Sequence, residues 1–218
     1  EGGQNGPCIP LSTEQSDKFS QFSADRLRYC QTREDILSFD EFSSNLIEES
    51  ANTTQVLKNT HALLEQLRTN PALIIQTPII FSDDYSELEE PVGLLRAIKD
   101  AGAFRRGSDG SNPINMMTAF GDRILTIEGK DGFNAFANTE LSSTLKNHDI
   151  EHVVLAGAVT SICIDSTGRS AHEQGYQVTV LSDCTCGRTN FEQEFYCEQI
   201  LPLYAEVCST QELLERLN

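Results

Sequence analysis

The sequence contains no tryptophan, two methionines and four histidines, and it has about half as many basic as acidic residues. Its 16 lysines and arginines against 33 aspartates and glutamates give a formal charge of −17 at pH 7. Such a chain would repel a nucleic acid or an anionic membrane surface, because binding to either depends on neutralising phosphates. We therefore expect neither nucleic acid nor a membrane among its partners.

Long hydrophobic runs are also absent. No apolar stretch approaches the roughly 20 residues of a membrane helix, and residues 1–10 lack the charged start and apolar run of a secretory signal.

The seven cysteines are odd in number, and the chain is too long for a disulfide scaffold. We expect reduced thiols in a soluble, cytoplasmic protein. Cys184 and Cys186 form neither a redox CxxC pair nor half of a zinc site, so we interpret them as packing thiols and keep a redox role as a further alternative.

The length and composition fit one large α/β domain, because 218 residues with 39% apolar content can bury a substantial core. Residues 1–34 are polar and poorly periodic, and we interpret them as an N-terminal extension. The domain is expected over residues 35–218, with a first strand at 35–39 that is followed directly by Asp40.

Strand and helix patterns then alternate along the chain. Leu63, Leu64 and Leu67 share one helical stripe, whereas 72–81 is an apolar run typical of a buried strand that ends near Pro78. Further strands are expected at 123–129, 152–157 and 176–181, and helices at 92–102, 160–174 and from 209 onward. This alternation predicts a three-layer α/β/α sandwich with a mostly parallel sheet, in which ligands bind at the carboxyl ends of the strands.

Two groups of polar residues are interpreted as structural. The acidic run at 83–91 is expected to be a solvated loop or helix face instead of a cation site. Surface or packing positions are expected for His148, His152 and His172.

Cys163 falls where the predicted strand 152–157 gives way to the predicted helix 160–174. A helix start presents unpaired N–H groups and a positive dipole end, which stabilise a thiolate. The alternative is a small core residue between Ile162 and Ile164.

A thiol nucleophile needs a base to take its proton and benefits from a nearby cation. Asp40 and Lys130 each follow a predicted strand, so a parallel sheet can bring both to the edge that holds Cys163. Taken singly, the aspartate could be a turn residue and the lysine a solvated loop residue.

The motifs from residue 130 onward resemble the isochorismatase-like cysteine hydrolase family. They are KDGFNAF at 130–136, TEL at 139–141, GAVTSIC at 157–163 and GYQV at 175–178. The resemblance covers about residues 35–218 and implies an α/β/α sandwich, in agreement with the alternation of strands and helices.

The resemblance also implies a catalytic triad of Asp40, Lys130 and Cys163. Cys163 would attack a carbonyl carbon, Asp40 would pass the thiol proton to the leaving amine, and Lys130 would stabilise the thiolate. The family has a non-proline cis peptide, here between Ala158 and Val159, and an oxyanion hole from the N–H groups matching Val159 and Cys163. No cofactor is implied. Because vinyl ether cleavage in this family does not require the thiol, Cys163 favours hydrolysis of a C–N bond in a small amide, ureide or imide through a thioester.

The sequence departs from the family pattern in two places. The usual Asp-x-Gln reads Asp40-Glu41-Phe42, and His61 is the only histidine between Asp40 and Lys130, which disfavours a metal-dependent nicotinamidase. The altered first motif favours the alternative of a catalytically idle binding or assembly module.

Two further expectations concern the substrate pocket and assembly. Phe133 and Phe136 could be pocket walls beside Lys130 or ordinary core aromatics. Family members often form oligomers, so we expect a homo-oligomer. Its expected substrate is a small molecule.

Overall fold

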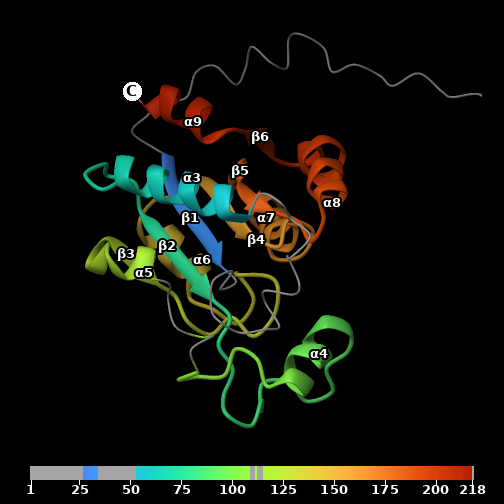
Figure 1. The fold of residues 1–218 in the computed structure, drawn as a ribbon. Coiled ribbons are helices and arrows are strands. Elements are labelled where there is room, and N and C mark those ends of the chain that lie inside the picture. The colour runs from blue at the N-terminus through green and yellow to red at the C-terminus, as the bar shows by residue number, and fades with distance from the viewer. Residues whose placement is uncertain (1–26, 34–52, 109–110, 112–114, 218) are drawn as a thin grey trace, which may run out of the picture.

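In the computed structural model, the described residues form a sheet of six parallel strands in the order β3-β2-β1-β4-β5-β6 (Figure 1). The structure describes residues 27–33, 53–108, 111 and 115–217. The strands are β1 (Leu27–Arg33), β2 (Ile74–Pro78), β3 (Ile124–Thr126), β4 (His152–Ala158), β5 (Gln177–Cys186) and β6 (Glu206–Cys208). The strand order reverses between β1 and β4, and in sheets of this kind ligands bind at the carboxyl ends of the strands near such a reversal.

Strand β1 lies in the middle of the sheet, paired with β2 on one side and β4 on the other. It lies within residues 1–34, which the sequence pattern set apart as an extension, so the first strand of the described sheet comes earlier than expected. Its sequence, LRYCQTR, lacks the continuous apolar run of the other central strands and carries no strand signal of its own. The expected strand at 35–39 lies outside the described residues.

Four helices cover the two faces of the sheet, which confirms the expected three-layer sandwich (Figure 1). Successive side chains of a strand point to opposite faces. Val154 and Ala156 of β4 therefore pack against α3 and α9, whereas Val153 and Leu155 pack against α6 and α7. These helices are α3 (Thr53–Gln66), α6 (Leu141–Asn147), α7 (Asp165–Glu173) and α9 (Thr210–Leu217).

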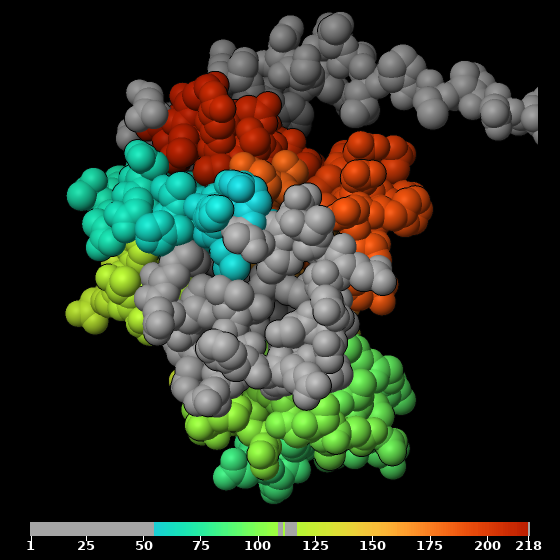
Figure 2. Space-filling model, viewed as in Figure 1, coloured from blue at the N-terminus to red at the C-terminus, as the bar shows by residue number. Residues whose placement is uncertain are grey.

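Residues 79–106, here called the lobe, lie beyond the carboxyl ends of the strands. The lobe contains α4 (Gly93–Ala101), which Figure 1 shows past the tips of the strand arrows, and it forms the green lower end of the molecule in Figure 2. Its base is closed by two backbone hydrogen bonds of 2.8 Å, from Phe81 N to Phe104 O and from Arg106 N to Phe81 O. Helix α4 ends at Gly102, whose φ of 69° suits glycine, and this confirms the expected helix end.

The remaining described helices are short. On the side of the molecule, α8 is followed directly by two further helical turns (Figures 1 and 2). These short helices are α5 (Asn115–Thr118), η3 (Gly121–Arg123), α8 (Asn190–Phe195), η5 (Tyr196–Ile200) and η6 (Leu201–Leu203). Within the described ranges, no helix combines the length and apolar character needed to cross a membrane.

Candidate active site

Cys163 lies in the first turn after β4, at the carboxyl end of the sheet. This turn is a π-helical segment, η4 (Thr160–Ile164), that continues directly into α7. The strand changes register against β5 at Gly157, whose φ of 127° is one that side chains other than glycine rarely adopt. The peptide bond between Ala158 and Val159, where the family resemblance implied a cis bond, is cis. The predicted position of the thiol between strand and helix is confirmed.

The side chain of Cys163 is completely buried. It belongs to an apolar cluster whose other buried members all come from the lobe, including Ile79, Phe81 and Phe104. Ile162 packs against the same cluster from the turn itself. The lobe therefore packs directly on the thiol.

Lys130 is also completely buried, although its sequence position suggested a loop. Its main chain pairs in parallel with Ile79, just beyond the end of β2. Among the described residues, its Nζ has no hydrogen-bond partner, and the buried hydroxyl of Thr77 near the end of β2 has none either. A buried ammonium without a partner is costly, so Lys130 needs a polar or anionic group beyond those that the described residues supply.

Cys163 and Lys130 lie at the same end of the sheet. Ile79 connects them, because it pairs with Lys130 and packs in the cluster that contains Cys163. The third expected member of the triad, Asp40, lies outside the described residues. The complete triad therefore stays a prediction.

The two phenylalanines expected at the pocket lie in different places. Phe133 packs against the cluster around Cys163. Phe136 instead packs in the core between the sheet and helices α6 and α7, where its ring stacks on Tyr176 at a centroid distance of 6.1 Å. The structure thus separates Phe133, which borders the thiol cluster, from Phe136, which belongs to the core.

Val159 packs in a small buried cluster with Val56 of α3 and with Ala158 and Cys186. Its carbonyl accepts hydrogen bonds from the amides of Ile162 at 3.0 Å and Ile164 at 3.3 Å, which define the turn around Cys163. The expected role of the Val159 and Cys163 N–H groups in an oxyanion hole stays a prediction.

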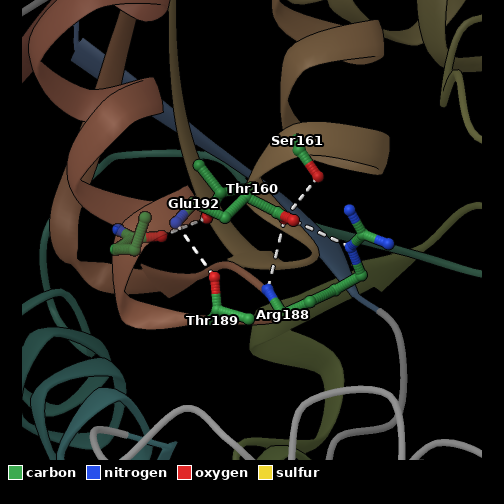
Figure 3. Close-up of polar contacts among 6 residues, drawn as sticks. Thr160, Ser161, Arg188, Thr189 and Glu192 are labelled. Carbon is green, nitrogen blue, oxygen red and sulfur yellow. Dashed lines mark hydrogen bonds and ion pairs between the residues drawn. The ribbon is translucent and has the colours of Figure 1, made fainter.

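Side chains of α8 hold the turn that carries Cys163 (Figure 3). The hydroxyl of Ser161 donates a short hydrogen bond to the carboxylate of Glu192. The hydroxyl of Thr160 donates to Oε1 of Gln193 at 2.5 Å. Sequence reasoning missed these residues, because nothing in the local pattern of α8 shows that it meets residues that lie 31 and 33 positions earlier in the chain.

The paired cysteines of β5 are packing residues. Cys184 and Cys186 are both buried, and burial raises the pKa of the Cys184 thiol to about 11. Its sulfur lies 3.0 Å from the hydroxyl of Thr210. This agrees with their interpretation as packing thiols.

His148, His152 and His172 occupy surface or packing positions, as predicted. His61, His148 and His172 are exposed, and His152 is partly buried at the start of β4. The His152 Nε2 lies 2.8 Å from the hydroxyl of Thr179, and burial lowers the pKa of this imidazole to about 4.

The acidic run at 83–91 is solvated, as expected, because all five of its carboxylate side chains are exposed. In the part of the chain that the structure describes, no cluster of three or more histidine, cysteine, aspartate or glutamate residues is arranged to hold a metal ion.

Solved structures share this fold. A cysteine hydrolase from Pseudomonas syringae pv. phaseolicola 1448A has a TM-score of 0.73 at 19% identity, covering 90% of this chain and 94% of that chain. N-carbamoylsarcosine amidase from Thermoplasma acidophilum has a TM-score of 0.67 at 18% identity, covering 85% of this chain and 96% of that chain. The fold is that of the isochorismatase-like hydrolases.

The sequence comparisons identify the family. The model of the isochorismatase domain matches residues 35–212, a range that includes Asp40, Lys130 and Cys163. The isochorismatase family protein YwoC of Bacillus subtilis (strain 168) is 26% identical over 173 residues, which are 75% of this chain and 84% of that protein. The chain belongs to the isochorismatase family of hydrolases.

Proposed function

We propose that this protein is a cysteine hydrolase that cleaves a C–N bond in a small amide, ureide or imide through a thioester intermediate. The observation that carries the proposal is the placement of Cys163 in the first turn after β4, with the buried Lys130 at the same end of the sheet and with no hydrogen-bond partner for its Nζ among the described residues. The names of two structural neighbours, a cysteine hydrolase and an N-carbamoylsarcosine amidase, support the same chemistry.

The proposed reaction has two halves. In the first, the Asp40 carboxylate takes the proton from the Cys163 thiol, and the thiolate adds to the substrate carbonyl carbon. The C–N bond then breaks, and the leaving nitrogen takes the proton from Asp40. In the second half, Asp40 takes a proton from water, the hydroxide adds to the thioester, and the acid product leaves as the proton returns to the sulfur.

Lys130 stabilises the negative charges of this cycle. A thiolate or carboxylate beside its Nζ would give the buried ammonium the partner that the described residues do not provide. In a site without water, such a pairing contributes more than it would at the surface. The proposed reaction requires no metal or cofactor, and the proposed substrate is a small molecule.

A second function has an observation in its favour. Cys163 has no exposed surface, and the lobe packs directly on it. A catalytically idle member of the family, kept as a binding or assembly module, would have no need to open this cover. Assembly as a homo-oligomer and a cytoplasmic location stay predictions in either case.

A substrate screen tests the proposal. Small amides, ureides and imides are incubated with the wild type, with Cys163→Ala, and with Cys208→Ala as the control on edge strand β6, and release of ammonia or amine is measured. We expect release by the wild type and by Cys208→Ala, and none above background by Cys163→Ala. Equal release by Cys163→Ala would rule out the covalent route.

A further inference from the structure

Two adjacent side chains of α8 bind two adjacent residues of the turn that carries Cys163 (Figure 3). Glu192 accepts the hydrogen bond from the hydroxyl of Ser161, and Gln193 accepts the one from the hydroxyl of Thr160. Ser161 lies two residues before Cys163. The contacts therefore reach the turn without touching the thiol itself.

The carboxylate of Glu192 is held in place from several sides. Its Oε1 accepts from the backbone amide of Arg188 at 3.2 Å, and its Oε2 accepts from Nε of Arg188 at 2.8 Å. Its own backbone amide donates to the hydroxyl of Thr189, which caps α8, at 3.1 Å. The Glu192 side chain is 11% exposed. A fixed and nearly buried carboxylate with charge-assisted bonds is a rigid anchor for the hydroxyl that it binds.

Gln193 ties the same helix to the sheet. Its Nε2 donates to the carbonyl of Ser182 and to the hydroxyl of Thr185, both at 3.1 Å. The chain at the end of β5 also lies close to α8, because a Cβ placed on Gly187 would lie 2.9 Å from the backbone nitrogen of Gln193. The start of α8 is thus anchored on β5 and can act as a fixed support for the neighbouring turn.

We propose that Glu192 is a positioning residue that orders the Cys163 turn through Ser161 and thereby sets the rate of the chemical step. The kinetic part of this inference rests on the proposed function. The structural part, the ordering of the turn, is independent of the proposed function. A positioning effect is expected because a displacement of about 1 Å in a reacting group costs on the order of 100-fold in rate.

Three variants separate this role from a general effect on the helix. Glu192→Ala removes the acceptor for Ser161 and the ion pair with Arg188. Glu192→Gln keeps an oxygen that can accept from Ser161. Glu194→Ala is the matched control, since it removes an exposed carboxylate from the same helix.

The kinetic readout is the split between kcat and KM for an amide that the wild type hydrolyses. For Glu192→Ala we expect kcat to fall by roughly 10- to 100-fold with KM unchanged within about twofold. Glu192→Gln should recover kcat to within about fivefold of the wild type, and Glu194→Ala should match the wild type. An unchanged kcat in Glu192→Ala, or an equal loss in Glu194→Ala, would overturn the proposal.

The second readout needs no substrate. Hydrogen–deuterium exchange of the peptide covering 159–164 reports on the amides of Ile162 and Ile164, which bond to Val159 O. We expect exchange there to be at least about tenfold faster in Glu192→Ala and unchanged in Glu194→Ala, with exchange in β4 unaltered. Unchanged exchange at 159–164 in Glu192→Ala would overturn the ordering role.

The two readouts distinguish the two proposals. If the wild type hydrolyses no amide, ureide or imide, the proposed function has failed, and the exchange experiment alone decides whether Glu192 orders the turn. If Glu192→Ala does not fold, Ser161→Ala takes its place, because it removes the same hydrogen bond from the other side. Exchange at the turn like that of the wild type in Ser161→Ala would overturn the proposal.

Discussion

Ile79 and Lys130 pair through their main chains just beyond the ends of strands β2 and β3. The side chain of Ile79 also packs in the cluster that encloses Cys163. One residue of the lobe therefore links the main chain of Lys130 to the cluster around the buried thiol. This relation underlies the proposal that the two groups act in one site.

Cys163 is expected to be more reactive than the other buried thiols. Burial raises the pKa of Cys184 to about 11 and that of Cys208 to about 12, so neither forms a thiolate near neutral pH. In the proposed site, Cys163 has a base and a cation to stabilise its thiolate. Iodoacetamide at pH 6, followed by peptide mass spectrometry, should label Cys163 before Cys184 and Cys208. Labelling of Cys163 no faster than of those two thiols would favour the idle module.

Lys130→Met is expected to abolish turnover without destabilising the fold. The change replaces a buried ammonium, which has no hydrogen-bond partner among the described residues, by an apolar side chain of similar length, and so removes the cost of burying that charge. We expect the free energy of unfolding in urea to stay the same or rise by about 1 kcal/mol or more. The control Lys146→Met, at an exposed position, should leave both activity and stability unchanged. A large loss of stability in Lys130→Met would show that the amine has a structural role.

Because of His152, the free energy of unfolding is expected to fall as the pH is lowered from about 6.5 to about 4. Burial lowers the pKa of its imidazole from 6.5 to about 4, while the charge of Glu206 opposes this and that of Arg216 adds to it. Between these two values the unfolded chain binds the proton and the native chain does not. The stabilisation is therefore fully present above pH 6.5 and is lost as the pH falls toward 4, by at most about 3 kcal/mol.

Urea unfolding at a series of pH values measures this effect. His152→Gln should flatten the slope between pH 6.5 and 4, whereas the exposed control His61→Gln should keep it. The same slope in wild type and His152→Gln would contradict the assignment.

Cys184 and Cys186 are expected to stay reduced in protein purified in air. Both sulfurs are buried, and the raised pKa of Cys184 keeps it a neutral thiol. Mass spectrometry of the peptide that contains both residues should show the reduced mass. A mass lower by two protons would revive the redox alternative.

Much of the fold followed from periodicity alone. The apolar run at 72–81 became β2, which ends at Pro78 as predicted, and the glycine after 93–101 ended α4. The order of strands and helices was sufficient to predict a parallel sheet with two covered faces. Strand β1 could not be predicted in this way, because LRYCQTR takes its place through pairing with β2 and β4 and not through an apolar pattern.

The site was predictable only in part. Sequence placed Cys163 and Lys130 directly after strands. The structure has Cys163 in the first turn after β4, whereas β3 already ends at Thr126 and Lys130 pairs with Ile79 beyond the end of β2. Their complete burial depends on how the lobe folds back, which no local pattern describes. Phe133 and Phe136 look alike in sequence, yet a three-residue step turns one toward the thiol cluster and the other into the core.

The most direct test of the central claim is to trap the acyl enzyme. The protein is mixed with an amide or ureide that the wild type hydrolyses. The reaction is quenched in acid within one turnover, and the protein is digested for mass spectrometry. We predict that the acyl mass is attached to the peptide that contains Cys163, and that it is absent from Cys163→Ala. Turnover by the wild type with no acyl group on Cys163, together with equal turnover by Cys163→Ala, would contradict the account.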